Sequence, residues 1–341
     1  MRILLVTQMW PSGADPDFGA FLVPQVDELR ALGHEVDVVA IDRRGGSAGV
    51  KYTRLGLRAL RRARKIRPDV VIAHMLFPAG AAALVAAQSV KAPLVVVCHG
   101  QDVENLDGMQ IRTVSGLVAR DAAAVVTNSD WLGERLREWL PGTETTTISP
   151  GVDLRAFDRS RIQRVADWPG DSPRLLCVGS LSERKNVVPL ADAFELLGRG
   201  SLVFVGDGEL REQLAGRPGV TLAGRIPHDH VARWAARCDL LCQPSVREPF
   251  GIAALEAMAL GKPVLVSAEG GAAEFVPADA GVVIYPSSAA AIAAGIEAAL
   301  ALPDPAAAAR RAAEQHSAAA EAARLAGLCQ AVTASGEAVT P

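Results

Sequence analysis

The sequence predicts an α/β protein built from two doubly wound parallel-sheet domains. Short apolar runs rich in Val, Ile and Leu recur along the chain, and a stretch with helical periodicity follows each of them. This alternation is typical of a parallel sheet that helices cover on both faces. The runs form two series, and the chain of 341 residues, 50% of them hydrophobic, is long enough for two cores of ordinary size.

The first series of apolar runs predicts six strands, at residues 3–7, 36–41, 70–73, 94–98, 124–127 and 146–149. The pattern then pauses over residues 157–173, where Pro, Gly, Trp and mixed charges replace the apolar period. We interpret this segment as the linker. Residues 1–157 are therefore predicted to form the N-terminal domain.

The second series predicts six further strands, at residues 175–178, 202–205, 220–222, 240–243, 263–266 and 282–284. The second domain is thus predicted over residues 158–304. Residues 305–333 are nearly all Ala, Arg, Glu and Leu, which predicts a C-terminal helix that packs back on the first domain. The carboxyl ends of both sheets are expected to border a shared crevice, where open α/β folds bind ligands.

Composition and charge exclude several classes of protein. A net charge of −3 gives no general attraction to nucleic acid. The apolar stretch at residues 3–6 is too short for a signal peptide, and no segment approaches the roughly 20 apolar residues that span a bilayer. Five cysteines without a C-x-x-C pair indicate reduced thiols. We therefore expect a cytoplasmic protein, soluble or peripheral to the inner face of the membrane, with no nucleic-acid partner.

The most informative segment is residues 247–261, R-E-P-F-G-I-A-A-L-E-A-M-A-L-G. Glu248 follows a predicted strand, and Glu256 lies about one and a half turns into the next helix. Backbone N–H groups at the start of this helix favour a diphosphate, because they are unpaired and lie at the positive end of the helix dipole. These groups belong to Phe250, Gly251, Ile252 and Ala253. The two carboxylates are expected to bind hydroxyls of a ribose or a sugar ring.

Two further motifs follow the first two strands of the second domain. In V-G-S-L-S-E-R-K-N, residues 178–186, Arg184 and Lys185 are placed to balance the charge that grows on a departing diphosphate. In V-G-D-G-E-L, residues 205–210, Gly206 and Gly208 occupy a strand-to-helix turn. The three motifs together predict an anion site in the second domain.

In this order, the motifs resemble those of the family 4 (group 1) glycosyltransferases, which are retaining enzymes of the GT-B fold with an E-x7-E signature. The run G-K-P-V-L-V-S-A-E-G-G-A-A-E-F-V, residues 261–276, also resembles this family. The resemblance covers residues 1–330. It implies a hexosyltransferase that takes a nucleotide-diphosphate sugar as donor. The expected acceptor is a lipid-linked sugar, a polysaccharide precursor of the cell envelope or a small molecule.

The resemblance also implies roles for residues of the second domain. Glu248 is placed near the donor sugar hydroxyls and Glu256 on the ribose, while Lys185 contacts the diphosphate. Ser180 stands where the family often has Arg, and Arg184 is the candidate to replace that guanidinium.

The same resemblance places two more residues on the donor, since Arg225 and Ile226 are expected near the nucleobase. A further departure is Asn186, which stands where the family often has Gly.

In the first domain, the resemblance rests on C-H-G-Q-D, residues 98–102. It implies that His99 lies next to the donor sugar and that Asp102 lies on the acceptor side. His74, which follows another strand, is also expected on the acceptor side. Gly19 in the first loop is expected to let the backbone approach the diphosphate.

No metal or other cofactor is predicted. Asp15-Pro16-Asp17 spells D-x-D, a metal-binding pattern in other transferase folds. We interpret it as a coincidence, because Arg184, Lys185 and the helix N-terminus already supply positive charge to the diphosphate.

The segment that begins at Lys51 and ends at Arg67 holds eight basic residues and no acidic one. Its apolar residues recur at nearly helical spacing, which predicts an amphipathic helix. Such a helix packs on its apolar stripe with a solvated basic face, lies on an anionic membrane, or binds an acidic glycan or a polyphosphate-bearing acceptor. These alternatives stay open.

Three other functions remain as alternatives. A sugar-nucleotide epimerase of the GT-B fold would need acid and base carboxylates that the sequence does not place. An NAD-dependent oxidoreductase is disfavoured because Thr7-Gln8-Met9-Trp10-Pro11 follows the first strand without G-x-G-x-x-G. A non-catalytic nucleotide-sugar binding protein would use the same residues without turnover.

Overall fold

The computed structural model describes residues 1–162 and 167–337, and its contacts divide the chain into two units. Unit 1 comprises Met1–Gly151 and Ala318–Pro341, and unit 2 comprises Val152–Ser317. Phe157 is 1% exposed and belongs to the same core cluster as Val152, inside unit 2. Each unit has its own sheet and its own cores.

The sheet of unit 1 has six parallel strands in the order β2-β1-β3-β4-β5-β6. The strands are β1 (Arg2–Thr7), β2 (Glu35–Ala40), β3 (Val70–His74), β4 (Leu94–Cys98), β5 (Ala124–Thr127) and β6 (Thr146–Thr147). Five of them are rich in buried Val, Ile, Leu and Ala, as expected of strands covered on both faces, and β6 is a two-residue exposed edge. All six predicted strands of this series are present.

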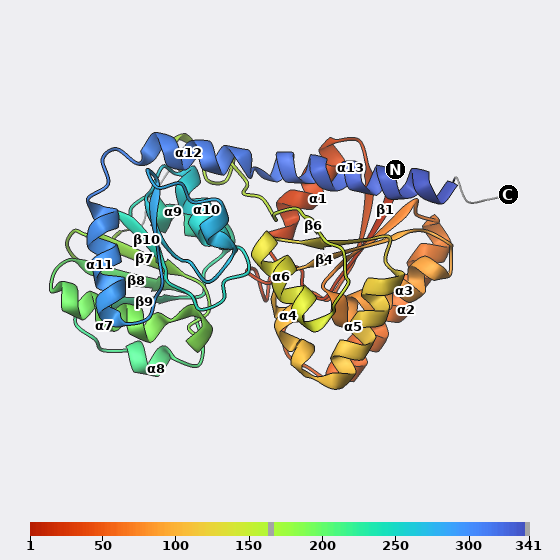
Figure 1. The fold of residues 1–341 in the computed structure, drawn as a ribbon, viewed down its shortest axis with the longest axis horizontal. Helices are drawn as coiled ribbons and strands as arrows, with labels where there is room; N and C mark the ends of the chain where they lie inside the picture. The colour runs from red at the N-terminus through yellow and green to blue at the C-terminus, as the bar shows by residue number, and fades with distance from the viewer. Residues whose placement is uncertain (163–166, 338–341) are drawn as a thin grey trace. The chain divides into compact units, whose positions relative to one another are not determined.

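Helices cover both faces of the unit 1 sheet (Figure 1). One face packs against α1 (Leu22–Ala31) and α13 (Ala318–Glu337). The other face packs against α2 (Ala48–Ile66), α3 (Ala81–Gln88), α5 (Met109–Asp121) and α6 (Asp130–Trp139). The short helix α4 (Gln101–Glu104) directly follows the loop at the end of β4.

The sheet of unit 2 also has six parallel strands, in the order β12-β11-β10-β7-β8-β9. They are β7 (Arg174–Val178), β8 (Ser201–Val205), β9 (Val220–Gly224), β10 (Leu240–Gln243), β11 (Val264–Ser267) and β12 (Gly281–Ile284). The predicted fold class, a doubly wound parallel sheet in each half of the chain, is confirmed.

The helices of unit 2 form two layers (Figure 1). One layer contains α7 (Val187–Leu197), α8 (Arg211–Leu214) and α11 (Ala289–Leu300). The other contains α9 (His228–Ala235), α10 (Ile252–Ala259) and α12 (Ala306–Gln315).

The predicted C-terminal helix at 305–333 is two helices, α12 and α13, which end and begin on either side of His316 and Ser317. The backbone of Val152 pairs with the chain at this break. Its N–H donates to the carbonyl of His316 at 2.9 Å, and it pairs with Ser317 as an isolated parallel bridge. As a result, α12 packs on α10 in unit 2, while α13 packs on α1 in unit 1. Within the described ranges, no helix is both long and apolar enough to cross a membrane.

Candidate functional site

At the carboxyl edge of the unit 2 sheet, three predicted site residues lie together. Nζ of Lys185 is 2.6 Å from Oε2 of Glu248, and Nη1 of Arg184 is 4.0 Å from the same oxygen. The topology explains this cluster, because β7 and β10 are neighbours and their following loops carry the basic and the acidic residue. The loops are also joined directly, since the N–H of Val246 donates to the carbonyl of Arg184 at 2.8 Å.

Glu248 is buried but ionised. Only 6% of it is exposed, and burial by itself would raise the pKa of its carboxyl. The charges of Lys185 and Arg184, with hydrogen bonds from Lys185 and Ser245, outweigh burial and lower the pKa below its usual value. The amide of Gln243 also donates to Oε2 of Glu248, at 3.1 Å. Gln243 was not predicted as a site residue, although its position at the end of β10 would have indicated it.

The two glycines of the V-G-D-G motif allow the loops after β7 and β8 to pack together. The N–H of Gly179 donates to Val205 at 2.9 Å, and the N–H of Leu181 donates to Asp207 at 3.1 Å. A Cβ atom at Gly206 would collide with the carbonyl of Gly179, and one at Gly208 with that of Leu181. The glycines are thus required by the protein's own packing, and their predicted contact with the donor stays a prediction.

Ser180 lies exposed in the same loop, and its Oγ is 3.1 Å from Oγ of Ser182. It offers one neutral hydroxyl at the position where the resemblance predicts an Arg in other members of the family. Arg184, partly exposed and within 4.0 Å of Glu248, is the guanidinium nearest to this position in sequence.

Helix α10 begins immediately after the Glu248 loop, as predicted. Gly251 caps it with a left-handed φ of +96°, and a Cβ there would lie 2.8 Å from Cβ of Ala272. The ring of Phe250 is buried against Phe275, with ring centroids 4.9 Å apart. Of the predicted anion-binding residues, Phe250 can therefore offer only its backbone, while the side chains of Ile252 and Ala253 are apolar.

Glu256 has a partner that the sequence analysis missed. Its Oε1 lies 2.6 Å from Nε2 of His228, the first residue of α9, and Glu256 itself is 4% exposed. The ring of Phe157 packs edge-on against His228 at 5.6 Å. The signal was the place of His228 shortly after β9, at the same sheet edge. Nearby, Arg225 is exposed and Ile226 packs on the core of unit 2, and their predicted contact with a nucleobase is untested.

In unit 1, three neighbouring strands bring polar side chains to one edge of the sheet. His74 ends β3, His99 follows β4 and Asn128 follows β5. Nδ1 of His74 is 2.8 Å from Nε2 of His99, and the amide nitrogen of Asn128 is 3.2 Å from Nδ1 of His99. The ring of Phe21 meets His99 edge-on at 5.2 Å. These residues form a chain of hydrogen bonds along the edge.

Both imidazoles are neutral at physiological pH. Burial lowers the pKa of His99 to about 3. Burial and the neighbouring His99 lower the pKa of His74 well below its usual value. No acidic side chain is hydrogen-bonded to either ring in the part of the chain that the structure describes, so nothing compensates the loss of solvation.

Asp102 holds the loops after β3 and β4 together. Its carboxylate accepts the N–H groups of His99 and Gly100, both at 3.0 Å, and that of Leu76 at 2.9 Å. Asp102 is 3% exposed and His74 is fully buried. Both side chains thus have partners inside the unit, and their predicted contact with an acceptor stays a prediction.

The first loop contains Gly19, whose φ of +71° and close approach to Met9 leave no room for a Cβ. In the D-x-D segment, Arg44 lies 3.1 Å from Asp15 and 2.9 Å from Asp17. The two carboxylates are therefore held by a guanidinium within unit 1.

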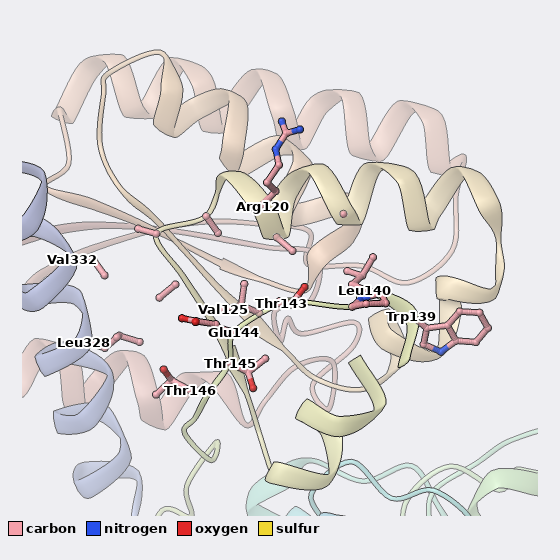
Figure 2. A pocket seen from close by; sticks show the side chains of 17 residues that line it. Arg120, Val125, Trp139, Leu140, Thr143, Glu144, Thr145, Thr146, Leu328 and Val332 are labelled. Atoms are coloured by element: carbon pink, nitrogen blue, oxygen red, sulfur yellow. The ribbon is translucent and has the colours of Figure 1, made fainter. Parts of the chain in front are cut away.

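A cavity of about 740 Å³ lies elsewhere in unit 1. It opens at the amino-terminal ends of β5 and β6, and α13 contributes Leu328 and Val332 to its wall (Figure 2). Arg120 and Glu144 also line it. His99 and Asn128 follow the carboxyl ends of their strands, so this cavity is at the opposite edge of the sheet, and none of the predicted site residues lines it.

Two family models match the chain. The one described as "Glycosyl transferases group 1" matches residues 158–316, and the one described as "Glycosyl transferase 4-like domain" matches residues 19–151.

Among curated proteins, a putative teichuronic acid biosynthesis glycosyltransferase, TuaC of Bacillus subtilis, is 26% identical over 87% of this chain and 88% of its own. Glycogen synthase of Mycobacterium tuberculosis is 29% identical over 91% of this chain and 80% of its own.

Solved structures match along nearly the whole chain. Sucrose-phosphate synthase from Thermosynechococcus elongatus superposes with a TM-score of 0.80 at 20% identity, covering 98% of this chain and all of that one. Anabaena HepE in complex with UDP-glucose superposes with a TM-score of 0.74 at 20% identity, covering 97% of this chain and all of that one. These similarities establish the fold.

Proposed function

Because the chain belongs to the group 1 glycosyltransferases and has the GT-B fold, we propose that it transfers a sugar from a nucleotide-diphosphate sugar to an acceptor hydroxyl, with retention of anomeric configuration. The observation that carries this proposal is the cluster of Lys185, Arg184 and the buried Glu248 beside the start of α10. It combines positive charge for a diphosphate with a carboxylate for hydroxyls.

In this proposal the diphosphate of the donor binds next to Lys185 and Arg184. The bond between the anomeric carbon and the phosphate oxygen breaks, and its electron pair leaves with the nucleoside diphosphate. The two cations and the amino end of α10 stabilise that charge. The acceptor oxygen then bonds to the sugar carbon, and its proton passes to the departing diphosphate.

Glu248 is proposed to accept donor sugar hydroxyls. Nζ of Lys185 and the amide of Gln243 both contact Oε2 of this carboxylate, which fixes its orientation before a sugar binds. Glu256, oriented by His228, is proposed to accept the ribose hydroxyls. No metal is needed in this scheme, because protein cations carry the charge of the leaving group.

We propose that the acceptor belongs to an envelope glycan and that α2 contacts an anionic membrane. A relative that matches most of the chain is named for teichuronic acid biosynthesis.

On α2, Leu55, Ala59 and Ala63 face the core, and Arg62 pairs with Asp37. Most of its other basic residues are exposed, as is Leu57, at 47%. Vesicles with anionic lipid should therefore retain the protein, while Arg61→Glu/Arg64→Glu should release it. Equal retention of the wild type and the double variant on these vesicles would contradict membrane contact.

The test of transfer is release of nucleoside diphosphate from a panel of UDP-, GDP- and ADP-sugars, with a lipid extract as acceptor and EDTA present. We expect one class of donor to be consumed, and the anomeric configuration of the product, measured by NMR, to match that of the donor. An epimerised sugar nucleotide without transfer, or an inverted product, would contradict the proposal.

A further inference from the structure

In the histidine pair of unit 1, one ring lies inside the protein and supports the other ring, which lies at the sheet edge. His99 is partly exposed at the sheet edge, while His74 is fully buried. Both ring nitrogens of His99 have protein partners, Asn128 at Nδ1 and His74 at Nε2. A ring bound at both nitrogens can neither rotate nor change tautomer without breaking a hydrogen bond.

The partners determine where the protons lie. The amide nitrogen of Asn128 can only donate, so Nδ1 of His99 must accept. A neutral imidazole has one N–H, which therefore lies on Nε2 of His99 and donates to Nδ1 of His74. The proton of His74 then lies on its own Nε2.

This arrangement does not favour stability alone. Among the residues that the structure describes, neither Nε2 of His74 nor Oδ1 of Asn128 has a hydrogen-bond partner, although both atoms are buried. Buried polar atoms without partners destabilise a fold, and an apolar residue of similar size at position 74 would avoid this cost. A role beyond packing would account for polar residues at both positions.

We propose that His74 and Asn128 are positioning residues, which together hold His99 in the tautomer with its proton on Nε2 and fix its ring plane at the sheet edge. Asp102 completes the arrangement by a different route, because its carboxylate binds the backbone N–H groups of His99 and Gly100 and leaves the two rings to each other. The lowered pKa values of both histidines agree with two neutral rings. The importance of this tautomer for turnover rests on the proposed function and on the role that the sequence resemblance implies for His99, next to the donor sugar.

The tautomer is measured by NMR of protein labelled with ¹⁵N-histidine, and His99→Gln assigns the His99 signals. We expect the wild type to show only the Nε2–H form of His99 from pH 6 to 8. His74→Leu removes the acceptor and should give a mixture of tautomers, whereas His74→Asn offers an acceptor near the position of Nδ1 and should restore the single form. Asn128→Leu tests the other partner if His74→Leu fails to fold. A mixture in the wild type, or the same single form in both Leu variants, would overturn the proposal.

Turnover separates positioning from a purely structural role. We expect His74→Leu to lower kcat about 10- to 100-fold with the KM for the donor unchanged, because a small misplacement of a substrate-contacting group slows the chemical step. His74→Asn should recover most of kcat. An unchanged kcat in a variant with mixed tautomers would overturn the positioning role. If the wild type transfers no sugar, the proposed function fails, whereas the tautomer measurement still decides the arrangement of the rings.

Discussion

The carboxyl edges of the two sheets have the same architecture, but their polar side chains differ in charge. In unit 1 the edge carries a neutral chain of His74, His99 and Asn128. In unit 2 it carries the ion pair of Lys185 with Glu248 and the contact of His228 with Glu256. Topology therefore decides where polar side chains gather, while the partners available to each side chain decide its charge.

Burial has different outcomes at the two edges. The histidines lose solvation without gaining a counter-charge, so they stay neutral. Glu248 is also buried, but the cations beside it keep it ionised. The edge of unit 2 is thus suited to a charged diphosphate, and that of unit 1 to uncharged hydroxyls.

The largest expected effect that separates the edges is on turnover in Lys185→Ala. Loss of this ammonium should reduce kcat about 100- to 1000-fold, since it removes a group that stabilises the leaving diphosphate. The double variant Lys185→Ala/Glu248→Gln avoids leaving the buried carboxylate of Glu248 without Lys185, its main partner. Arg199→Ala is the matched control, because it breaks an exposed pair with Glu297. A fully active Lys185→Ala would remove this residue from the mechanism.

A second difference is expected in the pH dependence of stability. The pKa of His99 is about 3 in the folded protein against 6.5 ordinarily, so between these values the unfolded chain binds a proton that the folded chain does not. The free energy of unfolding should therefore fall by up to about 1.4 kcal/mol per pH unit as pH drops from 6.5 towards 3. Urea titrations should show a smaller slope in His99→Gln, and an identical slope would contradict a neutral His99 ring. The contribution of Glu248 is expected only at lower pH, because its pKa is lowered from 4.5.

A third effect concerns nucleotide binding by unit 2. Glu256→Ala should weaken the binding of the nucleoside diphosphate by about 1–3 kcal/mol through lost ribose contacts. A deoxyribose analogue of the same nucleotide should bind wild type and variant almost equally, as measured by calorimetry. If the variant weakens the analogue as much as the parent nucleotide, Glu256 does not bind the ribose.

The smallest effect is expected from the partner of Glu256. His228→Ala should weaken nucleotide binding by about 0.5–1.5 kcal/mol, because it removes the hydrogen bond that orients the carboxylate. In the background of Glu256→Ala the same substitution should have little further effect. Additive losses would show that His228 acts independently of Glu256.

The sequence was sufficient for most of the strands, because they are runs of Val, Leu and Ile with a helix after them, while β6 is a short exposed edge of two threonines. It was not sufficient for the break between α12 and α13, which depends on the backbone of Val152 far away in the chain. In the site, Lys185 and Glu248 were predicted from motifs. Their contact, and that of Asn128 with His99, requires the strand order, which brings residues 63 and 29 positions apart together.

The most direct test of the donor site is calorimetric binding of UDP, GDP, ADP and NAD in EDTA, with wild type, Lys185→Ala and Glu256→Ala. We predict that one nucleoside diphosphate binds the wild type and that both substitutions weaken it. Binding of NAD alone, or a nucleoside diphosphate whose affinity neither substitution changes, would contradict a donor site built from Lys185 and Glu256.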